Sequence, residues 1–304
     1  MNDAQRDPAD EAAAGNTRFD NADAHIAGDR RLALATGVQI PHAVHGAALF
    51  ADISGFTPLT EALANELGSQ RGAEVLTANL NRVFHALISE LDRFGGHVIY
   101  FSGDAITCWL DGDDGARAAA CALAMQDAMA ELHEVVTPAG TRVRLALKVG
   151  VAVGAAQRFV VGDPDVQLID VLAGQLVNDL AAAEFYAEKG EVVLDRSALE
   201  ALGDKVEIRE TRIAQADGRP YGVVERLRVV VPDAPVASLD APLPTEVVQK
   251  WVLPAVFERL RTGRGEFLAE PVVAREAGPA RGDEAAHAGQ TGEGQRVGTC
   301  GDPE

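Results

Sequence analysis

The chain has 304 residues, 47% of them hydrophobic, and its 46 acidic and 27 basic residues give a formal net charge of −19. That size allows one full domain with a core, and the negative charge, without any basic patch, argues against a nucleic-acid partner. The three widely spaced cysteines form neither a disulfide framework nor a zinc cluster. Because no apolar stretch is long enough for a membrane span or a signal peptide, we expect a cytoplasmic protein without a membrane partner.

Residues 1–30 are rich in Asp, Ala, Asn and Gly without periodicity, and we expect them to be disordered. Beyond them, hydrophobic periodicity and turn residues predict alternating strands and helices. Thr57 is the expected N-cap of the first helix and Pro58 its first residue. The predicted elements are strands at 47–51, 97–101, 105–110, 143–153, 159–161, 166–172, 191–194, 206–212 and 221–231, and helices from 57, at 76–94, 113–136 and 176–187.

The order of these elements indicates the fold class. A hairpin at 97–110 stands between two helices that return to one sheet, which is typical of an α+β sandwich of ferredoxin-like type. A doubly wound parallel sheet is disfavoured, because each helix would then need a single strand on either side. After the folded region at 40–231, residues 232–270 are predicted to form a proline-rich linker and a helix at 245–260. The tail at 271–304 has almost no large apolar residue and is expected to be disordered.

Two aspartates mark the ends of neighbouring predicted strands. Asp52 ends the first strand, and Asp104 follows Gly103 in the turn of the hairpin. Alone, such an aspartate would be a turn or cap residue. Two carboxylates brought together repel each other unless cations lie between them, and this suits two Mg²⁺ or Mn²⁺ ions.

The segment after Asp52 has the features of a phosphate site. Ser54, Gly55, Phe56 and Thr57 lead into a predicted helix, whose first N–H groups and dipole favour anions. Glycine at position 55 would let a phosphate approach the backbone closely. The segment and the two aspartates together predict a site for a metal–triphosphate complex.

The string Phe50-Ala-Asp-Ile-Ser-Gly-Phe-Thr57, followed by Gly95-Gly96 and Gly103-Asp104, closely resembles the catalytic domain of class III adenylyl and guanylyl cyclases. The resemblance covers about residues 44–230 and is greatest to the first of the paired domains in bicarbonate-responsive soluble adenylyl cyclases. It implies a class III nucleotidyl cyclase fold at 40–231 and conversion of ATP, or alternatively GTP, to a cyclic nucleotide and pyrophosphate. It also implies that Asp52, Asp104 and the Ile53 carbonyl bind two ions, which activate the ribose 3′-hydroxyl and hold the pyrophosphate.

The resemblance further implies a catalytic centre shared across a dimer. The second domain would contribute a purine-reading Lys with an Asp or Thr, and an Asn and Arg that stabilise the transition state. Here Tyr100 and Val171 stand at the first two positions, Asn178 matches the asparagine, and Ala182 replaces the arginine. Asn178 could equally be the N-cap of its helix. We therefore expect a second cyclase domain as partner, in a homodimer or a complementary heterodimer.

Other functions stay open. A catalytically inactive pseudo-cyclase could bind nucleotide in a regulatory or scaffolding role. A diguanylate cyclase would have Gly-Gly-Asp-Glu-Phe at the hairpin, which Ser102-Gly-Asp-Ala-Ile106 does not match. Basic residues that bicarbonate-responsive relatives use are replaced at Tyr100 and at 181–182, so whether this chain responds to bicarbonate stays open. Since low-complexity sequence begins after Glu270, where a tandem relative would continue, we also hypothesise a truncated or out-of-frame longer protein.

Overall fold

The structure, a computed structural model, describes residues 25–236 and 242–261. Most of the segment at 1–30 and the whole tail at 271–304 lie outside these residues. The strands are β1 (Ala43–Ser54), β2 (His97–Ser102), β3 (Ala105–Asp111), β4 (Glu134–Val136), β5 (Arg142–Arg144), β6 (Ala146–Asp163), β7 (Gln167–Ala173), β8 (Val192–Leu194), β9 (Val206–Ile213) and β10 (Pro220–Leu227). The helices are α2 (Gly28–Thr36), α3 (Phe56–Leu67), α4 (Ser69–Arg93), α5 (Ala116–Leu132), α6 (Gln175–Phe185), α7 (Arg196–Leu202), α8 (Thr245–Val248) and α9 (Pro254–Arg261).

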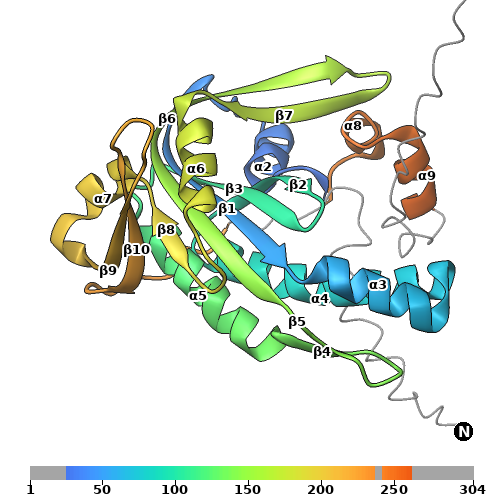
Figure 1. Ribbon diagram of the computed structural model, residues 1–304. Helices are drawn as coiled ribbons and strands as arrows, with labels where there is room; N and C mark the ends of the chain where they lie inside the picture. The colour runs from blue at the N-terminus through green and yellow to red at the C-terminus, as the bar shows by residue number, and fades with distance from the viewer. Residues whose placement is uncertain (1–24, 237–241, 262–304) are drawn as a thin grey trace, which may run out of the picture. The chain divides into compact units, whose positions relative to one another are not determined.

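Within the described residues, eight strands form one sheet in the order β2-β3-β1-β6-β8-β10-β9, with β7 paired to β6 (Figure 1). Its first part, β2-β3-β1-β6, is antiparallel throughout. Helices α3 and α4 connect β1 to β2, and α5 lies between β3 and β6 in the chain. A sheet in this order, with helices in these two crossovers, is the predicted α+β sandwich of ferredoxin-like type.

The two faces of the sheet have separate cores. Because side chains alternate along a strand, Leu49, Ala51 and Ile53 of β1 pack with helices α3, α4 and α5. Ala48 and Phe50 belong to the opposite face, where residues of α6 cover the sheet. Figure 1 shows α6 on one side of the sheet and α5 on the other. Continued along β1, this alternation places Asp52 on the α6 face.

The structure corrects several predicted boundaries. Helix α3 begins at Phe56 with Gly55 as its N-cap, so the prediction that Thr57 caps it is wrong. The helix predicted at 113–136 ends at Leu132, because residues 134–136 are β4, which pairs with β5. The strands predicted at 143–153 and 159–161 mostly belong to one strand, β6, which is 18 residues long. Local periodicity could not show that one strand pairs with β1 along its first part and with β7 along its last part.

Three further differences concern elements near the ends of the domain. The helix predicted at 245–260 is two short helices, α8 and α9, because a proline at 254 begins a new helix instead of continuing one. The final strand, predicted at 221–231, ends at Leu227. Helices α2 and α7 were not predicted, and α2 begins inside the segment expected to be disordered.

Helix α2 is anchored by buried ion pairs to the β6–β7 hairpin, which we call the arm (β6 from residue 157, and β7). Arg158 of β6 is 1% exposed and pairs with Asp29 of α2 and, at 2.6 Å, with Asp170 of β7. Arg30 of α2 also pairs with Asp170, at 2.9 Å. Two arginines and two aspartates thus neutralise one another, as buried charges require.

The arm also binds the C-terminal helices. The amide of Leu168 on β7 donates a hydrogen bond of 2.6 Å to the Lys250 carbonyl. Around it, one apolar cluster joins Ile26, Trp251 and Phe257. The first and last described segments therefore meet on the arm. No helix in the part of the chain that the structure describes combines the length and apolar character needed to cross a membrane.

Candidate active site

The structure brings the two predicted aspartates to the same end of the sheet. Asp52 lies near the end of β1, opposite Ala105 of β3 in the strand register. Asp104 lies in the turn that precedes β3, and its carbonyl accepts a hydrogen bond of 3.2 Å from the Ile53 amide. Gly103 makes this turn possible with a φ of 64°, in the left-handed region.

The carboxyl group of Asp104 is poorly suited to carry its charge in this position. Burial raises its pKa above the ordinary value for aspartate, and the nearby charge of Asp52 raises it further. Lys148 opposes the shift. A divalent cation between the two carboxylates would favour the ionised form of Asp104.

The turn from β1 into α3 depends on Gly55. This residue has a φ of 107°, and a Cβ atom on it would lie 2.4 Å from the carbonyl oxygen of Arg144. Only glycine fits such a backbone without displacement. The strand can therefore turn directly into the helix, which places the first amides of α3 immediately after Asp52.

In this turn, the groups predicted to bind phosphate are mainly those of the backbone. The first N–H groups of α3 are those of Phe56 and Thr57. They come before the hydrogen bond of 3.3 Å that the Leu59 amide donates to the Gly55 carbonyl. The Phe56 side chain is buried in the core, whereas Thr57 is exposed. The Ser54 hydroxyl donates to the Ala146 carbonyl at 3.2 Å. Free N–H groups at a helix start favour anions, so the geometry is compatible with the predicted anion site.

Lys148 and Glu184 belong to the site, and sequence reasoning missed both. Lys148 stands directly across from Asp52 in the β1–β6 register, and its Nζ lies 3.3 Å from Asp52 Oδ2. Glu184 of α6 accepts a second hydrogen bond from the same ammonium group. Burial alone would lower the pKa of Lys148, but its bonds to Glu184 and Asp52 raise it. The available signal for Lys148 was its charge inside the otherwise apolar run at 145–153.

The residues present fit metal ions that share their ligands with a substrate. In residues 25–236 and 242–261, no group of three or more His, Cys, Asp or Glu side chains could hold a metal ion alone. Magnesium typically binds one or two carboxylates and completes its coordination with substrate phosphates and water. Asp52 and Asp104, next to an anion-binding helix start, are donors of this type.

Comparison with known proteins identifies the family. The model of the adenylate and guanylate cyclase catalytic domain matches residues 41–222, more than half of the chain. The chain belongs to this family. Adenylate cyclase type 10 of Rattus norvegicus is 31% identical over 169 residues, and that of Homo sapiens is 29% identical over 167 residues. Each match covers 51% of this chain but only 10% of the relative.

Solved cyclase structures agree with the fold. The guanylyl cyclase Cya2 is 26% identical, with a TM-score of 0.52 over 61% of this chain and 93% of that chain. The adenylyl cyclase CyaB from P. aeruginosa has a TM-score of 0.51 over 62% of this chain and 98% of that chain; at 23% identity it supports the fold alone. The chain thus has the class III cyclase fold.

The positions expected to complete a cyclase centre lie elsewhere on this domain. Tyr100 of β2 is 45% exposed, and Val171 lies on β7. Asn178 is exposed on α6, whose N-cap is Gly174, so the alternative that Asn178 caps this helix is wrong. Ala182 is half-buried against a core cluster near the start of β10. In the described residues, no hydrogen bond or ion pair joins Asn178 to either aspartate.

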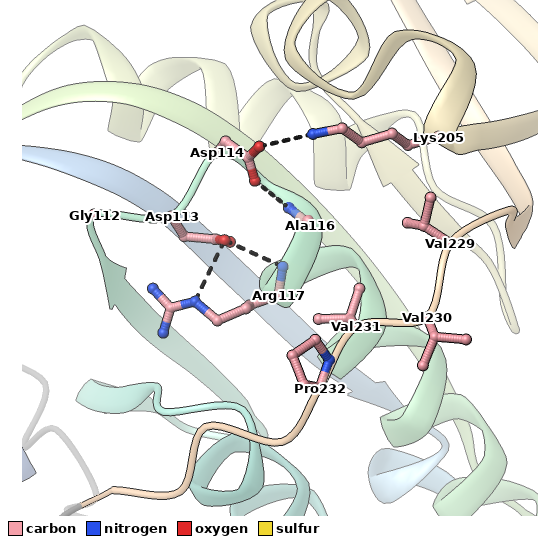
Figure 2. A pocket seen from close by; sticks show the side chains of 10 residues that line it. All are labelled: Gly112, Asp113, Asp114, Ala116, Arg117, Lys205, Val229, Val230, Val231 and Pro232. Carbon is pink, nitrogen blue, oxygen red and sulfur yellow. Dashed lines mark hydrogen bonds and ion pairs between the residues drawn. The ribbon is translucent and has the colours of Figure 1, made fainter.

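A separate hollow of about 550 Å³ lies at the opposite end of β3 from Asp104. Figure 2 shows that its acidic side chains are already engaged at the start of α5. Asp113 accepts hydrogen bonds from the Arg117 and Ala118 amides, and Asp114 pairs with Lys205 at 3.1 Å. These acidic groups are therefore explained by hydrogen bonds to the first turn of α5 and by the ion pair with Lys205, and the hollow contains none of the cyclase site residues.

Proposed function

We propose that this chain is the metal- and triphosphate-binding half of a nucleotidyl cyclase that converts ATP to 3′,5′-cyclic AMP and pyrophosphate. The observation that carries the proposal is the convergence of Asp52, Asp104, Lys148 and the start of α3 at one end of the sheet. Carboxylates, a cation and free amides in one place match the mixed charge of a metal–triphosphate complex.

Each group has a distinct role in this proposal. Asp52, Asp104 and the Ile53 carbonyl would hold two Mg²⁺ or Mn²⁺ ions, which supply charge neutralisation and activation of the ribose hydroxyl. The amides of Phe56 and Thr57 would bind phosphate oxygens. When the ions bind, the Lys148 ammonium would move from the Asp52 carboxylate to a phosphate oxygen. Catalysis then depends on positioning and on stabilising charge at the phosphates.

The second half of the centre would come from another cyclase domain. Tyr100 and Val171 stand where a purine selector would have a Lys and an Asp or Thr, and Ala182 offers no cation for the transition state. An arginine in that role is worth on the order of 10³–10⁵ in rate in phosphoryl transfer. We propose ATP as substrate because the curated relatives are adenylate cyclases; GTP is the alternative.

Binding of Mn²⁺-ATP to the purified chain tests the metal half. We expect Asp52→Asn and Asp104→Asn each to abolish metal-dependent nucleotide binding, measured by titration calorimetry. Asp111→Asn is the matched control, because Asp111 is an exposed aspartate at the other end of β3, and it should bind as the unmodified chain does. Unchanged Mn²⁺-ATP affinity in both site variants would contradict the site.

The absence of an arginine at position 182 also favours a second candidate function. A domain that binds nucleotide without turning it over would act as a regulatory or scaffolding pseudo-cyclase. Cyclic AMP formation separates the two functions when a complementary class III domain is added. A pseudo-cyclase would bind Mn²⁺-ATP but form no cyclic AMP with any such partner.

A further inference from the structure

One ammonium group is shared by two carboxylates at the proposed metal site. Lys148 contacts Asp52, which the proposed function makes a metal ligand, and Glu184, which that function does not use. The three side chains are only partly exposed, at 25%, 25% and 19% respectively. Their interactions are therefore less screened by water than those of a surface pair.

The backbone fixes Glu184 in this position. Gly150 follows Lys148 by two residues on β6, so the two face the same side of the sheet. A Cβ atom at position 150 would lie 2.6 Å from the Glu184 amide nitrogen. Because residue 150 has no side chain, α6 approaches the strand closely enough for Glu184 to reach the lysine. Glu184 is thus held beside the site by helix packing.

Lys148 and a metal ion would compete for the same carboxylate. The lysine neutralises Asp52 in the metal-free protein, and its ammonium has to leave when divalent ions bind there. Glu184 offers that ammonium a second anionic partner, so it need not move into water. A lysine held in this way stays next to the phosphate oxygens that arrive with the metal.

We propose that Glu184 is a positioning residue, which draws the Lys148 ammonium away from Asp52 and thereby opens the carboxylate to the metal. This inference rests on the proposed metal site and assigns a role to a residue outside it. It implies that Glu184 assists metal binding only through Lys148. Removing Lys148 and removing Glu184 should therefore change the metal affinity in opposite directions.

Without nucleotide, water would take the place of the phosphate ligands, and the two carboxylates should bind Mn²⁺ weakly. The test measures this affinity from the electron paramagnetic resonance signal of free Mn²⁺. We expect Lys148→Met to tighten Mn²⁺ binding and Glu184→Gln to weaken it, each by about threefold to tenfold, as expected for a partly exposed ion pair. In the Lys148→Met background, Glu184→Gln should change the affinity by no more than about twofold. Glu184→Asp keeps the charge and should restore most of the affinity.

Asp179→Asn is the matched control. It removes another α6 carboxylate with an arginine partner, Arg219, and should leave Mn²⁺ affinity unchanged. Thermal unfolding of every variant verifies that it is folded. Mn²⁺ binding that requires Asp52 but is insensitive to Glu184→Gln, or equally sensitive in the Lys148→Met background, would overturn the positioning role alone. Mn²⁺ binding that Asp52→Asn leaves unchanged would contradict the metal site and the inference together.

Discussion

Gly55 links the proposed metal ligand on β1 to the proposed phosphate-binding start of α3, and its backbone tolerates no side chain. We expect Gly55→Ala to cost about 3 kcal/mol of unfolding free energy, from the left-handed φ and the clash with the Arg144 carbonyl. Gly37→Ala should cost only about 1 kcal/mol, because Gly37 has a φ of 75° but no atom within 4 Å of its Cβ position. Urea unfolding measures the free-energy cost of both substitutions. Equal costs would show that the clash between the new side chain at position 55 and the Arg144 carbonyl is relieved by small backbone shifts.

The carboxyl group of Asp104 predicts an unusual pH dependence. Burial, and then the charge of Asp52, raise its pKa in the folded chain above the unfolded value. Its stabilising contribution is therefore complete below the unfolded pKa and is lost as the pH rises through the folded pKa. We expect Asp104→Asn to raise the melting temperature of the metal-free chain at pH 7, with a gain that shrinks as the pH falls. A lower melting temperature at pH 7 would contradict this.

At the scale of single residues, the sequence revealed groups that lie close together along the chain. Asp52 and the turn at 54–57 form one continuous motif, and Gly103-Asp104 is a recognisable turn. Lys148 and Glu184 could not be found in this way. Their roles depend on the β1–β6 register and on how closely α6 approaches Gly150, and both are properties of tertiary packing.

At the scale of elements, the ion pairs around Arg158 determine whether α2 stays on the arm. We expect Arg158→Met to destabilise the chain by about 3–5 kcal/mol, because it leaves Asp29 and Asp170 buried with too little positive charge. Arg158→Met/Asp29→Asn should cost less, since Arg30 and Asp170 still form a neutral pair. Urea unfolding compares the two variants. A double variant less stable than the single one would refute this account.

The same ion pairs should make the anchor sensitive to acid. Burial would raise the pKa of Asp29, but the hydrogen bond and charge of Arg158 outweigh it and lower the pKa. The resulting stability is present above the unfolded pKa and is lost as the pH falls through the folded value. The hydrogen-exchange protection factors of the α2 amides should therefore fall on acidification before those of β1 do. A simultaneous fall in both would contradict a local release.

Among the elements, long periodic segments were predicted well and short ones were not. The hairpin of β2 and β3 and the helix α4 carry clear patterns, so both elements are confirmed, although α4 begins at Ser69 instead of at residue 76. Helix α7 has only seven residues, too few for periodicity to show. The extent of β6 depends on its partners, β1, β7 and β8, which a local pattern does not contain.

At the scale of the whole molecule, activity should depend on a partner domain. We expect the chain alone to form little cyclic AMP from Mn²⁺-ATP. Adding a class III domain that carries the purine-reading lysine and the arginine should raise turnover by on the order of 10³-fold. With Asp52→Asn in this chain, the same partner should give no increase. Full activity of the chain alone would show that another group replaces the missing arginine.

The contacts of the arm have a mechanical consequence. Helix α2 is ion-paired to it, and residues 242–260 are joined to it through the Lys250 carbonyl and the cluster around Trp251. A force applied through either end of the domain therefore reaches the arm before it reaches β1. The strand that carries Asp52 lies in the interior of the sheet, between β3 and β6. Tension on the flanking chain would consequently act first on the arm, and it would reach the metal site through β6, which carries both the arm and Lys148.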